Sequence, residues 1–159
     1  MEESTLKYWK DAGHVARRTL EAMKLELTPG KTFHEVIESA ERYIHRHGGK
    51  PAFPGTIAVN DLAAHFTTDH SVNAVEGWDG EMVLQKGDCV KIDFGVHIKG
   101  HIADNALTFE IGNGNEHTEQ IKAAKEARDA AIEMLHPGTP WYKVGQAAAQ
   151  PSLLSLIHI

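Results

Sequence analysis

Apolar side chains recur along the first third of the chain with the spacing of helices. Residues 5–25 carry an apolar stripe of helical period, and Pro29-Gly30 ends the segment. The stripe comprises Tyr8, Ala12, Val15, Leu20 and Met23. Thr32 and Glu35 then form a capping-box pattern, apolar positions of helical spacing follow, and Gly48-Gly49 closes this second segment. Two amphipathic helices are therefore expected before residue 50.

Alternation of apolar and polar residues replaces the helical spacing in the middle of the chain. A β-branched run at residues 56–59 follows a loop with two prolines and predicts a short strand. Every second residue of 90–98 is apolar, which predicts a half-buried strand. Residues 98–100 can form a tight reversal in which Gly100 supplies a positive φ. Residues 101–111 are therefore expected to return as the second strand of a hairpin.

Helical composition returns after the glycine-rich break at residues 112–115. Alanine, isoleucine, glutamate and lysine predict a third helix between residues 116 and 135, which Pro137-Gly138 would stop. Thr139-Pro140 suits the start of a fourth helix. No internal repeat is evident. Together these patterns predict an α+β fold in which helices pack on an antiparallel hairpin sheet.

Residues 151–159 depart from the pattern before them. Pro151 is expected to interrupt the fourth helix soon after it begins, and an apolar nonamer then ends the chain without caps or charge. Residues 154–159 also match one reading frame of the mosaic-end adapter used in transposon-based DNA libraries. We therefore expect residues 1–150 to form the N-terminal portion of a single domain, and residues 151–159 to be a non-native tail.

Composition narrows the class of protein. A chain of 159 residues that is 42% hydrophobic and 24% charged suits a soluble domain with one modest core. A net charge of -6 without a basic stripe argues against a nucleic-acid binder. The single cysteine, Cys89, excludes an internal disulfide and a multi-cysteine zinc cluster, as suits a reducing compartment. The acidic N-terminus lacks signal-peptide character and no run reaches transmembrane length, so a cytoplasmic protein without a membrane partner is expected.

Two aspartates are conspicuous because both lie in the predicted hairpin. With the turn centred between residues 98 and 99, Asp93 and Asp104 fall directly opposite each other on one face. Directly opposed Cβ atoms lie about 4.5–5.5 Å apart, and like charges at that separation destabilise a sheet. A divalent cation would offset the repulsion, because carboxylate oxygens are hard ligands and can bridge two ions. The alternative is a pair of solvated carboxylates, one of them neutralised by Lys91 on the same face, and spacing alone leaves both possibilities open.

The residues around this pair resemble a known family. KIDFGVHIKGHIADNALTF, at residues 91–109, is similar to the hairpin of type 2 methionine aminopeptidases of the archaeal kind. GGKPAFPGTIAVNDLAAHF, at residues 48–66, is similar to an upstream motif of the same family. The similarity extends over about residues 5–150. It implies the first half of the pita-bread fold of the M24 metallopeptidases, in which two pseudo-symmetric α+β halves surround a dinuclear metal site.

The resemblance also implies roles for individual residues. Asp93 matches the family's first metal-ligand aspartate, and Asp104 matches the aspartate that bridges both ions. His65 matches the catalytic histidine that lines the substrate pocket, although on the residues alone it is more simply a loop histidine. One histidine and two glutamates, the remaining ligands, are expected beyond Gln150. The implied cofactors are two divalent ions, Mn, Fe, Co or Zn, and the implied reaction is removal of N-terminal methionine by metal-activated water.

Nascent polypeptide N-termini are the implied partners, with the ribosome as a further candidate. Two alternatives remain open, a non-catalytic pita-bread binding protein of the ribosome-associated type and an Xaa-Pro aminopeptidase or dipeptidase, which shares the two-aspartate hairpin. Residues 67–82 resemble a loop insertion, whose histidine and acidic residues form either an extra cation site or an acidic surface loop. With two of the five expected ligands, the chain by itself is expected to be inactive.

Overall fold

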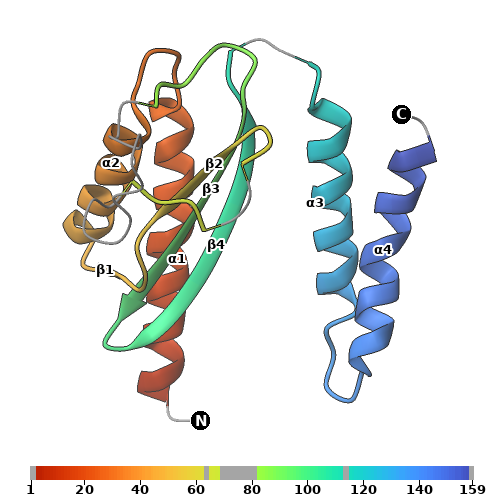
Figure 1. Cartoon of the computed structure of the whole chain (residues 1–159). Coiled ribbons are helices and arrows are strands. Elements are labelled where there is room, and N and C mark those ends of the chain that lie inside the picture. Colours follow the sequence, from red (N-terminus) through yellow and green to blue (C-terminus); the bar gives the residue numbers. More distant parts are fainter. Residues whose placement is uncertain (1–2, 63–64, 69–81, 113–114, 158–159) are drawn as a thin grey trace. The chain divides into compact units, whose positions relative to one another are not determined.

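The computed structural model describes residues 3–62, 65–68, 82–112 and 115–157, and its elements form two compact units, Met1–Gly114 and Asn115–Ile159 (Figure 1). The first unit contains α1 (Glu3–Glu26), α2 (Phe33–Arg46), β1 (Lys50–Pro51), β2 (Thr56–Val59), β3 (Cys89–Ile98) and β4 (His101–Glu110). The second unit contains α3 (Thr118–Glu133) and α4 (Trp141–Ile157). The expected α+β class is confirmed. Within the described ranges no helix is both long and apolar enough to cross a membrane.

β3 is the central strand of an antiparallel sheet. β4 pairs with it over all ten residues on one edge. β2 pairs with residues 90–93 on the other edge, and the short strand β1, which the sequence did not predict, pairs with residues 96–97 further along that edge. Every residue of β3 and β4 therefore has a partner strand on at least one side. The pairing register determines which side chains lie on each face of the sheet.

The hydrophobic core lies between the two N-terminal helices and one face of the sheet. α1 packs on β3 and β4, and α2 packs on α1, β1 and β2 (Figure 1). The even-numbered residues of β3 from 90 to 96 are buried against these helices, as the alternation predicted. The largest fully buried side chains of the unit include Phe33, Phe94, Met23, Ile44, Ile57 and Ile92. The odd-numbered residues of β3 therefore lie on the opposite, outer face of the sheet.

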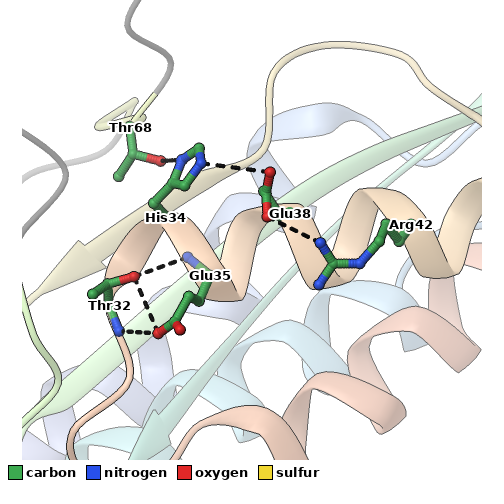
Figure 2. Close-up of polar contacts among 6 residues, drawn as sticks. All are labelled: Thr32, His34, Glu35, Glu38, Arg42 and Thr68. Carbon is green, nitrogen blue, oxygen red and sulfur yellow. Dashed lines mark hydrogen bonds and ion pairs between the residues drawn. The ribbon is translucent and has the colours of Figure 1, made fainter.

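The start of α2 is fixed by the capping box that the sequence predicted. Figure 2 shows the reciprocal pair: the Glu35 N–H donates to the Thr32 hydroxyl at 3.1 Å, and the Thr32 N–H donates to the Glu35 carboxylate at 2.8 Å. The two bonds satisfy backbone donors that the helix itself leaves without partners. α2 consequently begins at Phe33, the first residue of the predicted helix.

The hairpin turn is shorter than the expected three-residue reversal. Lys99 and Gly100 form a two-residue loop with φ of 49° and 82°, and Ile98 lies opposite His101. Two successive positive φ values match the twist of the flanking strands and are typical of tight hairpin loops. The expected turn centre between residues 98 and 99 is therefore wrong, since the centre lies between Lys99 and Gly100.

The turns of the two helical hairpins share one backbone conformation. Both hairpins turn at a Pro-Gly pair whose glycine has a positive φ, 93° at Gly30 and 89° at Gly138. The same two backbone hydrogen bonds close each turn: Thr28 N–H to Glu26 and Lys31 N–H to Thr28 in the first, His136 N–H to Met134 and Thr139 N–H to His136 in the second. The likeness is therefore one of local turn geometry.

α4 passes through Pro151 and continues to Ile157, so the expectation that Pro151 interrupts this helix is wrong. Proline removes the single N–H that would bond to the Ala147 carbonyl. Three consecutive alanines precede Gln150, and alanine is the strongest helix former, so the loss of one hydrogen bond does not end the helix. The division of the chain at residue 150 and the non-native origin of residues 151–159 stay predictions.

Candidate metal centre

Asp93 and Asp104 lie on the same, outer face of the sheet, as predicted, but they are not directly opposite each other. Asp93 pairs with Ala106, and Asp104 pairs with Gly95. The turn centre lies one residue later than expected, which shifts the pairing by two positions, keeps both carboxylates on one face and makes them diagonal neighbours. Diagonal residues of an antiparallel pair lie about 7–8 Å apart, within reach of each other's side chains.

The carboxyl group of Asp93 is in an unfavourable environment for a lone negative charge. Burial raises the pKa of Asp93, the charge of Asp104 and a hydrogen bond with its carboxyl group raise it further, and His65 and Lys91 oppose the shift. Among the described residues, the buried Oδ1 of Asp93 has no hydrogen-bond partner. Buried polar atoms are nearly always paired, so an orphaned oxygen next to a second carboxylate fits a cation site. The donor set suits a hard divalent ion.

His65 lies within electrostatic reach of Asp93 because its segment runs alongside β2. The Ile57 N–H donates to the Phe66 carbonyl at 2.9 Å, and Thr56, the neighbour of Ile57, lies opposite Asp93. The His65 side chain is exposed, and its charge lowers the pKa of Asp93. The structure thus brings together all three residues that the sequence predicted for the site. Their roles in binding metal and substrate stay predictions.

An aromatic ring beside the carboxylates was missed at the level of sequence. A Cβ placed on Gly95 would lie 2.2 Å from Cε1 of Phe53, so this ring covers Gly95 on the outer face. The Ala52 N–H donates to the Gly95 carbonyl at 2.9 Å and holds the ring's segment against β3. Two signals could have indicated the contact: the phenylalanine of the Pro-Ala-Phe-Pro motif, and a glycine at an outward position of β3.

Lys91 shares the outer face with the two aspartates and lies opposite Thr108. Its charge lowers the pKa of Asp93, but it is the weakest of the influences on that group and does not cancel the effects of burial and of Asp104.

Among the described residues, no group of three or more possible ligands is close enough to hold a metal. Most of the predicted insertion, with the candidate cation ligands at 69–81, lies outside the described residues.

The fold is that of one part of the pita-bread aminopeptidases. Aminopeptidase P from Escherichia coli matches with a TM-score of 0.84 at 18% identity, over 99% of this chain and 34% of that protein. Methionine aminopeptidase from Rickettsia prowazekii matches with a TM-score of 0.80 at 22% identity, over 95% of this chain and 60% of that protein. At such identities the likeness shows the fold alone.

The sequence model of metallopeptidase family M24 matches residues 7–152, and the chain belongs to this family. Methionine aminopeptidase from the archaeon Thermococcus onnurineus is 38% identical over 136 residues, which make up 86% of this chain and 43% of that relative. The resemblance to archaeal methionine aminopeptidases is therefore confirmed. The chain spans less than half the length of this curated relative.

Proposed function

We propose that this chain supplies the Asp93–Asp104 part of a dinuclear metal centre that removes N-terminal methionine from nascent peptides. The observation that carries the proposal is the orphaned, buried Oδ1 of Asp93 beside Asp104 on the outer face of the sheet. The family membership and the similarity to methionine aminopeptidases support it. The remaining ligands, one histidine and two glutamates, are expected beyond Gln150 on the resemblance, and in the described part of the chain no third ligand lies at the site.

The proposed cofactors are two divalent ions, for which Mn, Fe, Co and Zn are all compatible with carboxylate and imidazole ligands. When bound, such ions supply a water activated at neutral pH and polarise the scissile carbonyl. Asp93 would hold one ion and Asp104 would bridge both. The exposed His65 would contact the peptide near its scissile bond.

Phe53 suits the recognition of the first side chain of the substrate. Its half-buried ring lies over Gly95, the residue opposite Asp104 and two positions from Asp93 on the same face of β3. An unbranched thioether side chain packs favourably against an aromatic ring. A substrate whose amino terminus lies at the carboxylates would therefore place a methionine side chain against Phe53.

A chimeric enzyme tests the proposed activity. Residues 1–150 are joined to the part of the Thermococcus onnurineus enzyme that this chain does not cover. The chimera is expected to release methionine from a Met-Ala-Ser peptide, to lose activity on chelation and to regain it with Mn or Co. Asp104→Ala should abolish the activity, whereas the matched Glu110→Gln on the same strand should keep it. Full activity in the Asp104→Ala chimera would refute the bridging role.

The same chimera distinguishes the alternatives. Cleavage of Xaa-Pro peptides without release of methionine would identify an Xaa-Pro aminopeptidase. Binding of Mn without hydrolysis of either substrate would identify a non-catalytic binding protein. Peptide N-termini are the proposed partners in the cytoplasm, and an association with the ribosome is predicted by the resemblance alone.

A further inference from the structure

The segment that carries His65 is anchored to α2 as well as to β2. The Phe66 ring contacts the Phe33 ring edge to face, with centroids 6.3 Å apart and an interplanar angle of 89°. Two residues further on, the Thr68 hydroxyl lies 3.3 Å from Nδ1 of His34. Figure 2 shows His34 extending from the first turn of α2 to Thr68. The segment is therefore held at Phe66 and at Thr68 by groups outside it.

The His34 ring is itself oriented by the next turn of α2. Its Nε2 lies 3.6 Å from Oε1 of Glu38, an ion-pair distance, and Glu38 accepts a hydrogen bond of 2.9 Å from Arg42 (Figure 2). Residues four apart on a helix share one face, so these three side chains form a row. A carboxylate facing Nε2 favours the proton on that nitrogen, which leaves Nδ1 to accept a hydrogen bond from the Thr68 hydroxyl.

His65 needs such anchors because its backbone conformation is unfavourable. Its φ is 69°, in the left-handed region that residues other than glycine seldom adopt. A strained conformation of this kind costs on the order of 1–3 kcal/mol and persists only where surrounding contacts over-determine it. For His65 the contacts on the C-terminal side are the Phe66 carbonyl, the Phe66 ring and the Thr68 hydroxyl.

We propose that His34 and Thr68 are positioning residues, which hold His65 in its left-handed conformation beside Asp93. The role in catalysis rests on the proposed function, whereas the effect on the backbone of His65 does not. His34 acts through Thr68, and Glu38 fixes the ring of His34. Loss of the Thr68 hydroxyl leaves, among the described contacts of the segment, those of Phe66, and His65 then relaxes toward ordinary backbone conformations and moves away from Asp93.

The test uses NMR on the whole chain without metal. The one-bond Cα–Hα coupling of His65 reports the sign of its φ. We expect a positive-φ coupling in the parent and in Thr68→Ser, which keeps the hydroxyl, and its loss in Thr68→Val and His34→Ala. His47→Ala is the matched control, because His47 stacks on Tyr43 at the other end of α2, with ring centroids 4.0 Å apart, and should leave His65 unchanged. An unchanged coupling in Thr68→Val and His34→Ala overturns the proposal, and so does an equal change in His47→Ala.

A second readout adds Mn²⁺ to the same variants. Mn²⁺ bound at the aspartates should broaden the NMR signal of the His65 ring. This signal is assigned as the one that disappears in His65→Asn. Most of the broadening should be lost in Thr68→Val but kept in Thr68→Ser. If the parent shows no broadening that depends on Asp104, the proposed metal site fails, and the coupling still decides the positioning role. If the broadening is equal in the parent and in Thr68→Val, the positioning role fails and the metal site stands.

Discussion

Asp104 lies opposite Gly95, and not opposite Asp93, in the β3–β4 ladder. The two aspartates are therefore diagonal neighbours, and the position opposite Asp104 has no side chain. Phe53 fills the space above that glycine. The resulting site has an acidic diagonal with an apolar wall beside it, which suits the proposed binding of a peptide amino terminus that carries an apolar side chain.

Gly95→Ala is expected to destabilise the protein by about 1–3 kcal/mol, the usual cost of overpacking. The new methyl group would overlap the Phe53 ring, with three ring atoms at 2.2, 2.6 and 2.9 Å. Urea denaturation measures the loss. Gly13→Ala is the matched control, because a Cβ on Gly13 has no neighbour within 4 Å and lies inside α1, where alanine should stabilise by about 0.5–1 kcal/mol. Equal stability of Gly95→Ala and the parent would show that Phe53 does not cover this glycine.

The capping box predicts a pH-dependent contribution to stability. The backbone N–H and then the hydroxyl of Thr32 lower the pKa of Glu35 below its usual value of 4.5. Because the folded-state pKa is the lower one, the stabilisation is complete above the unfolded-state pKa and is lost as the pH falls through the folded-state pKa. The parent should exceed Glu35→Gln in the free energy of unfolding at neutral pH, and the difference should shrink in acid. A difference that is the same at both pH values would contradict the prediction.

Most secondary structure follows from local signals, and the register does not. The apolar period places α1, α2 and β3 within a residue or two, and residues 56–59 are a strand at the predicted bounds. The pairing of Asp104 depends on whether the turn is centred between residues 98 and 99 or between Lys99 and Gly100, which a lysine followed by a glycine does not decide. The contact between Phe53 and Gly95 joins a loop residue and a strand residue distant in sequence, so no periodicity reveals it.

Two further features of the structure, the shared turn conformation and the unequal burial of Phe33 and Trp141, also depend on backbone geometry or tertiary contacts. The match between the turns at Gly30 and Gly138 is visible in φ and in hydrogen bonds, but few side chains around them are identical. Trp141 is the first residue of α4, as Phe33 is of α2. The exposed fraction of Trp141 is 79%, whereas that of Phe33 is 2%. Burial therefore differs between equivalent positions of one backbone motif, and only the structure shows it.

Cys89 is expected to react slowly with alkylating reagents at neutral pH. Burial raises the pKa of its thiol, the charge of Glu110 raises it further, and Lys91 opposes the shift. Since the thiolate is the reactive form, iodoacetamide should modify the native protein more slowly than the urea-unfolded chain. Glu110→Gln should lower the pKa and speed the reaction, and Lys91→Met should slow it. Identical pH–rate profiles for native and unfolded protein would contradict this account.

The central claim, that Asp93 and Asp104 together hold a divalent ion, is tested most directly by Mn²⁺ titration of the whole chain with detection by NMR. Saturable broadening should be centred on β3 and β4 around residues 93 and 104. It should be lost in Asp93→Asn and in Asp104→Asn, and kept in Glu110→Gln, which removes a charge from the far end of β4. Broadening that is unaffected by either asparagine substitution, or that is centred elsewhere on the chain, would contradict the claim.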